Sequence, residues 1–216
     1  MKTKEVILKS AEQFVKQELD SDRSGHDWWH IQRVRRLAVE LARVENANLF
    51  VCELSALLHD VADEKLNESK EAGLLKVQHW LAEQKIDKRT IGEIMTIIST
   101  MSFNGGSNPS METIEGKVVQ DADRLDALGA IGIARTFIYT GWKGQLLHDP
   151  ERDFRHLDYR SEEKTAIYHF YEKLLKIKAL LNTEYAKQIA ENRHQFMEIF
   201  LEQFYNEWEL RDNMEE

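Results

Sequence analysis

Apolar residues along most of the chain recur at intervals of three and four positions, which is the period of an amphipathic helix. In residues 28–44 this stripe is formed by Val34, Leu37, Ala38, Leu41 and Ala42. The same periodicity predicts further helices over residues 3–19, 69–84, 88–100, 112–125, 126–139, 161–181 and 183–208. Residues 49–61 are apolar at most positions and predict a helix that is buried on most sides. The pattern therefore favours an all-α fold.

Composition supports long helices in a chain of 216 residues. The two prolines, Pro109 and Pro150, and ten glycines argue against a turn-rich β fold. The one cysteine, Cys52, excludes an intrachain disulfide, and we expect it to be a small buried apolar residue. No apolar run approaches the length of about 18 residues that a membrane helix needs. We therefore expect a cytoplasmic protein that neither spans a membrane nor carries an export signal.

The chain carries a net charge of −9, from 29 basic and 38 acidic residues. This excess of acidic residues disfavours a general nucleic-acid binder, which needs a basic surface to displace the counterions of the phosphate backbone. A small phosphorylated substrate is still compatible with the charge. One divalent metal can supply the local positive charge that the chain as a whole lacks.

Histidine and aspartate carry the strongest chemical signal. Three His-Asp pairs occur, at His26-Asp27, His59-Asp60 and His148-Asp149, whereas random placement of these residues would give roughly 0.5 by composition. Only His59-Asp60 follows a densely apolar run. An aspartate at that place is costly to bury unless it is paired or bound to a metal. Imidazole and carboxylate together suit Mn, Fe or Zn better than an ion held by oxygen alone.

Neighbouring residues on an α-helix point about 100° apart. His59 and Asp60 can therefore reach one ion only at a helix end or a distortion, and the remaining ligands must come from other helices. His30 is a candidate because it shares the inward face of its predicted helix with Val34.

A second candidate region is the acidic cluster Asp121, Asp123 and Asp126. Asp123 and Asp126 are three positions apart and share a helix face, whereas Asp121 points nearly opposite to Asp123. Nearby apolar residues place this cluster at the border of the core.

These residues resemble the HD-domain superfamily of metal-dependent phosphohydrolases, whose pattern is H…HD…D. The corresponding segments here are HIQRV, ALLHDVADEK and QDADRLDALGAIG. The flanking segments HDWWH and YTGWKGQ are similar to a bacterial branch that includes nucleoside triphosphate pyrophosphohydrolases. The resemblance implies an all-α HD-domain helical bundle with an appended C-terminal helical pair. It implies a single HD-type domain over residues 1–216, with a core at about 25–139 and a helical extension, 140–216, packing on that core.

By this resemblance the metal ligands are His30, His59, Asp60 and Asp123. Matching HIQRV to the family's His-x-x-Arg-Val selects His30 as the first ligand in place of His26. His79, the only histidine between the HD pair and Asp123, lies in a segment without a matching motif. We therefore expect one divalent ion, with Mn²⁺ favoured and Mg²⁺, Co²⁺, Ni²⁺, Fe²⁺ and Zn²⁺ as alternatives.

Four protein ligands leave coordination positions for water and for a phosphate oxygen, and a metal lowers the pKa of bound water. Asp63 lies one turn beyond Asp60 and is the candidate general base or water-orienting residue. The alternative interpretation is that Asp63 is a solvated residue at the C-terminal end of its helix. Glu64 would take the role if the helix ended early.

Candidate substrate-binding residues are His26, Lys65 and Arg124. Arg124 follows Asp123, and Lys65 lies shortly after the HD pair, so each can donate to phosphate. The alternative for both is a solvated or salt-bridged side chain. His26 lies one turn before His30 and contacts either the substrate or the start of its helix. Arg33 is expected to be structural and to pair with an acidic neighbour.

The resulting hypothesis is a metal-dependent phosphohydrolase whose partner is a small-molecule nucleotide. Its most specific form is cleavage of a (deoxy)nucleoside triphosphate to monophosphate and pyrophosphate by metal-bound hydroxide. The alternatives are a 5′-nucleotidase acting on monophosphates, a cyclic-dinucleotide or alarmone phosphodiesterase, and a non-catalytic nucleotide-sensing module. The sequence leaves open whether the chain forms a homodimer.

Overall fold

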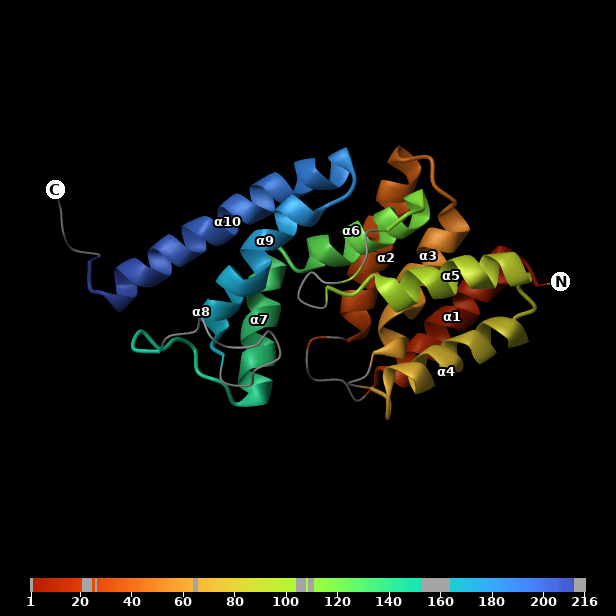
Figure 1. Cartoon of the computed structure of the whole chain (residues 1–216), viewed down its shortest axis with the longest axis horizontal. Helices are drawn as coiled ribbons and strands as arrows, with labels where there is room; N and C mark the ends of the chain where they lie inside the picture. Colours follow the sequence, from red (N-terminus) through yellow and green to blue (C-terminus); the bar gives the residue numbers. More distant parts are fainter. Residues whose placement is uncertain are drawn as a thin grey trace. The chain divides into compact units, whose positions relative to one another are not determined.

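The computed structural model describes residues 2–20, 25, 27–63, 66–103, 108, 111–152 and 164–211. These residues form helices joined by turns and loops, and no strand occurs among them. The expected all-α class is therefore confirmed. The chain divides into two compact units, residues 1–126 and 127–216 (Figure 1). The single domain implied by the resemblance, with its extension packed on the core, stays a prediction.

The first unit is a helical bundle built around one buried helix. Its elements are α1 (Lys4–Glu18), α2 (Trp28–Val44), α3 (Leu49–Leu58), the 3-10 turn η1 (His59–Ala62), α4 (Lys70–Glu83), α5 (Lys88–Thr100) and α6 (Ile114–Asp126). Helix α3 packs against α1, α2, α5 and α6 (Figure 1). All residues of α3 from Val51 onward are buried except Glu53. The apolar run that predicted a helix buried on most sides is thus the centre of this core.

Local side chains fix the starts of the helices that position the candidate site. The Asp27 carboxylate accepts a 2.8 Å hydrogen bond from the backbone N–H of His30 at the start of α2. Asn48 caps α3 by accepting from the backbone N–H groups of Phe50 and Val51. These caps satisfy amides that a helix leaves without an internal partner.

Cys52 lies in α3 and is fully buried, as expected from the sequence. Burial raises the pKa of its thiol to about 12, and the carboxylate of Glu115 adds to the shift. The cysteine therefore stays protonated at neutral pH and acts as a small apolar side chain.

The second unit contains α7 (Gly129–Lys143), α8 (Ala166–His169), the π turn η3 (Phe170–Leu174), α9 (Leu175–Ile177), the 3-10 turn η4 (Lys178–Leu180) and α10 (Glu184–Trp208). Helix α10 packs against α7. Aromatic rings fill this unit, with Phe170 stacked on Phe200 at a centroid distance of 5.6 Å. The expected C-terminal helical pair is thus formed by residues 166–180 and α10.

Three predicted helices differ from the structure by more than one or two terminal residues. The helix expected over 49–61 ends at Leu58, where the 3-10 turn η1 begins. The segment expected to be one helix over 161–181 departs twice from α-helical hydrogen bonding, in a π turn and in a 3-10 turn. Residues 161–163 lie outside the described part. The helix expected from residue 126 begins at Gly129. The φ of Gly129 is +71°, a left-handed conformation that interrupts the helix between the end of α6 and the start of α7. None of the described helices is both long and apolar enough to cross a bilayer.

A charged cluster surrounds the π turn of the second unit. The carboxylate of Glu172 accepts a hydrogen bond from Lys164, which is 6% exposed, and another from His169 Nδ1 at 2.9 Å. Desolvation opposes ionisation of Glu172, but these two hydrogen bonds outweigh it, so the pKa of Glu172 is lowered. Burial lowers the pKa of His169 as well, although the hydrogen bond to Glu172 opposes that shift.

We expect Glu172→Gln to lower the free energy of unfolding by about 3 kcal/mol at pH 7, because it removes the carboxylate that Lys164, a buried lysine, contacts. The pKa of Glu172 is lower in the folded than in the unfolded chain. The ionised Glu172 carboxylate therefore stabilises the fold at any pH above its pKa in the unfolded chain. This stabilisation is lost as the pH falls through its lower pKa in the folded chain. The difference in free energy of unfolding between the wild type and Glu172→Gln, measured by urea denaturation, should shrink below pH 4.5.

Glu191→Gln is the matched control, since Glu191 pairs with Lys178 at 2.6 Å on the surface of the same unit. We expect this control to denature like the wild type. Equal stability of the Glu172 and Glu191 variants at pH 7 would contradict a structural role for the buried cluster.

Candidate metal centre

The HD pair lies where α3 gives way to the tighter η1 turn. Helix α3 ends at Leu58, and His59 and Asp60 are the first two residues of the 3-10 turn. His59 Nε2 lies 3.2 Å from Asp60 Oδ1, so these two neighbouring side chains converge. A helix end of this kind is what the sequence required if both were to reach one ion. Both residues are buried, at 8% and 7% exposure.

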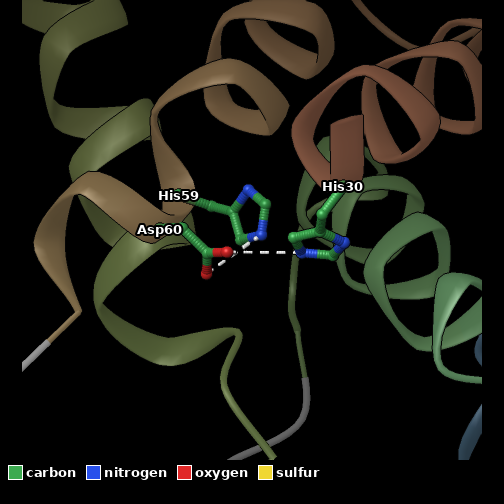
Figure 2. Close-up of side chains that lie close together, drawn as sticks. All are labelled: His30, His59 and Asp60. Carbon is green, nitrogen blue, oxygen red and sulfur yellow. Dashed lines mark ion pairs between the residues drawn. The ribbon is translucent and has the colours of Figure 1, made fainter. Parts of the chain in front are cut away.

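His30 approaches the HD pair from α2. Its ring is fully buried, and its Nε2 lies 3.3 Å from Asp60 Oδ2. The rings of His30 and His59 are edge to face, with centroids 5.3 Å apart (Figure 2). One ligand atom from each of His30, His59 and Asp60 lies within 4.8 Å of the other two. This His-His-Asp grouping has the size and donor types to hold one divalent cation.

Asp123 adds a carboxylate from α6. Its Oδ1 lies 3.5 Å from His30 Nε2 and 3.8 Å from His59 Nε2. The side chain of Asp123 is 32% exposed, whereas the other three are nearly inaccessible. The four residues predicted as ligands are thus brought together from α2, η1 and α6, with Asp123 on the side open to solvent.

Hydrogen bonds behind the two rings orient both histidines toward the centre. His59 Nδ1 lies 2.9 Å from the carbonyl of Ala56, and His30 Nδ1 lies 2.7 Å from Asp126 Oδ2. A carbonyl and an ionised carboxylate only accept, so each Nδ1 carries the proton and each Nε2 presents a lone pair.

The Nε2 atom of His59 provides a test of whether these residues fit a metal. This atom is buried and accepts no hydrogen bond from any residue that the structure describes. A buried lone pair without a partner is costly, and a cation at the centre would satisfy it. The residues therefore fit a divalent metal.

Asp126 holds a position that sequence reasoning did not assign, whereas Arg33 makes the acidic pairing expected of it. Asp126 was expected only to be a neighbour of Asp123, yet it is 2% exposed and lies behind the His30 ring. Arg33 was expected to pair with an acidic neighbour, and that neighbour is Asp126, at 2.7 Å from Nε and 3.1 Å from Nη2. Both residues lie three positions beyond a predicted ligand, and this spacing was the available signal.

Of the other predicted site residues, the structure describes Arg124 and Asp63. Arg124 is half-buried beside Asp123. Burial lowers the pKa of its guanidinium, while Asp121 and Asp123 oppose the shift. Asp63 lies just beyond η1, in extended backbone, and its N–H donates to the carbonyl of Asp60 at 3.0 Å.

Three candidates lie outside the described residues, namely His26, Lys65 and Glu64. His79, expected to be ordinary, is exposed on α4.

Comparison with known proteins identifies the family. The HD domain profile matches residues 28–128, a span that contains all four predicted ligands. The Bacillus subtilis protein YpgQ is 40% identical over 201 residues, which cover 91% of this chain and 92% of YpgQ. An HD-superfamily hydrolase from Bacillus thuringiensis is 50% identical to this chain and covers 96% of it. The chain belongs to the HD-domain family. It is therefore a hydrolase of the metal-dependent phosphohydrolase class, as the resemblance implied.

Solved structures of similar proteins share the fold over nearly the whole chain. A Lactobacillus plantarum protein is 42% identical with a TM-score of 0.86, covering 97% of this chain and 100% of its own. The Bacillus thuringiensis hydrolase, 50% identical, has a TM-score of 0.76, and the match covers 96% of this chain and 99% of that protein. YpgQ in complex with ADP is 38% identical with a TM-score of 0.74, and the match covers 93% of this chain and 97% of YpgQ.

We expect His59→Ala to weaken Mn²⁺ binding to the metal-free protein by more than about 100-fold, because it removes a donor whose geometry is fixed in advance. Isothermal titration calorimetry measures this affinity directly. His79→Ala is the control and should bind like the wild type, since its ring is exposed on α4. Unchanged Mn²⁺ affinity in the His59 variant would contradict a metal centre at this place.

Proposed function

We propose that this HD-family protein hydrolyses nucleoside triphosphates to monophosphates and pyrophosphate with one divalent ion, Mn²⁺ being favoured. The observation that carries the proposal is the convergence of His30, His59, Asp60 and Asp123 around one point. A complex of the relative YpgQ with ADP supports a nucleotide as the substrate class.

In this proposal His30, His59, Asp60 and Asp123 hold the ion. Two imidazole nitrogens and two carboxylates suit Mn²⁺, Fe²⁺, Co²⁺, Ni²⁺ or Zn²⁺ better than Mg²⁺, which prefers oxygen ligands. The bound ion supplies a lowered pKa for a water ligand and polarisation of a phosphoryl oxygen.

The exposure of the four side chains favours one direction of approach for the substrate. His30, His59 and Asp60 close the inner side of the centre, and Asp123 is the ligand that solvent reaches. A phosphate group entering beside Asp123 meets the neighbouring Arg124 of α6. Burial of the Arg124 side chain strengthens a hydrogen bond to a phosphate oxygen, because the competing water is scarce.

Asp63 is proposed as the residue that orients the attacking water and accepts its proton. Its place directly after the HD turn keeps it close in sequence to Asp60, and the backbone hydrogen bond between them fixes the chain at this point. His26 and Lys65 are proposed as further contacts to the nucleotide.

The proposed reaction is tested by a panel of nucleoside mono-, di- and triphosphates incubated with the protein and Mn²⁺. We expect monophosphate and pyrophosphate from triphosphates, and no turnover by Asp60→Ala, which lacks a ligand. His79→Ala should retain full activity. Release of orthophosphate from monophosphates would replace the proposal with a nucleotidase. Tight nucleotide binding without turnover would replace it with a sensor, and full activity of Asp60→Ala would exclude the centre as the active site.

Asp63→Asn tests the proposed base separately from the metal. We expect kcat to fall by about 100-fold or more, because general base catalysis contributes at least that much. Mn²⁺ affinity should stay as in the wild type, since Asp63 is not a proposed ligand. A variant with wild-type kcat would remove Asp63 from the mechanism.

A further inference from the structure

The structure supports the two histidines of the candidate centre in unlike ways. Behind His59 the acceptor is a backbone carbonyl of the preceding helical turn, at Ala56. Behind His30 the acceptor is Asp126, a side chain 96 positions away in sequence. Because a backbone carbonyl comes with the helix, only the support of His30 depends on particular side chains.

Asp126 is held in place by an arginine from the same helix as His30. Arg33 lies three residues after His30 on α2 and donates to both oxygens of Asp126, at 2.7 and 3.1 Å. The carboxylate is 2% exposed, and a buried carboxylate stays ionised only when it is paired and hydrogen-bonded. Arg33 provides that pairing, and the same carboxylate lies 2.7 Å from His30 Nδ1 through its Oδ2.

His30 is thus fixed at three points. Its backbone N–H is bound by Asp27 at 2.8 Å, its Nδ1 by Asp126 at 2.7 Å, and its Nε2 faces Asp60. Helix α6 supplies both Asp123, which faces Nε2, and Asp126, which lies behind the ring three residues further on. The imidazole is therefore held between two carboxylates of a single helix.

We infer that Asp126 and Arg33 are positioning residues that set the affinity of the centre for its metal by fixing the tautomer and direction of His30. This inference rests on the proposed metal-dependent function and goes beyond it, since neither residue contacts the ion. A carboxylate behind a ligating imidazole raises the basicity of the nitrogen facing the metal. An arginine behind that carboxylate extends the chain of contacts to Arg33–Asp126–His30.

Asp126→Asn is the primary variant, because it keeps the shape of the side chain and removes its charge. Calorimetric titration of metal-free protein with Mn²⁺ should show an affinity about 10- to 100-fold lower than that of the wild type. Arg33→Lys keeps a positive charge but loses the bidentate contact with Asp126, and we expect a smaller loss of Mn²⁺ affinity. The Mn²⁺ affinity of Arg33→Gln should lie between those of Arg33→Lys and Asp126→Asn. At saturating Mn²⁺ the kcat of Arg33→Lys should recover, which a loss of a catalytic group would not allow.

Glu53→Gln is the matched control. Glu53 of α3 also accepts two hydrogen bonds from an arginine of α2, Arg35, at 2.8 and 2.6 Å, and the substitution likewise removes a carboxylate charge. We expect its Mn²⁺ affinity to stay within about threefold of the wild type, since only second-layer contacts to a ligand carry the larger effect. An equal loss in Glu53→Gln would overturn the inference, because the effect would then belong to the loss of any arginine–carboxylate pair of α2.

A second measurement does not depend on metal or activity. Crystal structures of the metal-free wild type and of Asp126→Asn show the direction of each imidazole ring. We expect the His30 ring to turn or to occupy more than one rotamer in Asp126→Asn, and the His59 ring to stay as in the wild type. An unchanged His30 ring together with wild-type Mn²⁺ affinity in Asp126→Asn would overturn the inference.

The same experiments separate this inference from the proposed function. Wild-type protein that binds Mn²⁺ but hydrolyses no nucleotide would contradict the proposed reaction and leave the positioning role supported by the variants. Wild-type protein that binds none of Mn²⁺, Co²⁺ and Ni²⁺ would contradict both.

Discussion

The cost of burying polar side chains at the end of the most apolar helix is the constraint on which the first unit depends. Helix α3 forms the centre of that unit, and the next two residues, His59 and Asp60, are nearly as buried as the core itself. Each such group needs a partner, or its desolvation would cancel the gain from the apolar contacts around it. The surrounding helices are placed accordingly. Helix α2 brings His30 and Arg33, and α6 brings Asp123 and Asp126.

Sequence reasoning succeeded where the determinants are local. The helices expected over 28–44 and 88–100 have those bounds in the structure, because each follows an aspartate cap and keeps a regular apolar stripe. The sequence also offered His30 and the acidic cluster at Asp123 as candidates to join His59 and Asp60, because a buried HD pair needs further partners from other helices. The resemblance to the HD family then selected His30, His59, Asp60 and Asp123 as the ligand set.

The remaining features depend on contacts between distant segments. Two aspartates three positions apart share a helix face, but periodicity cannot tell which of them faces the centre and which lies behind a histidine ring. The answer is set by Arg33, whose two contacts hold Asp126 in place. The breaks within residues 161–181 were missed for a similar reason. A π turn preserves the apolar periodicity well enough to look like continuous helix. Glu172, which lies in this turn, contacts Lys164 and His169, and such contacts between side chains leave no trace in the periodicity.

Cys52 gives the buried helix a chemical reporter. The thiol lies on α3, seven residues before His59, and is inaccessible with a pKa of about 12. A thiol reagent reacts with the thiolate, so it can modify Cys52 only when α3 opens to solvent. The rate of labelling therefore measures how often the helix leading to the HD pair is released from its neighbours. A ligand that binds at the far end of α3 would slow that release without touching the cysteine.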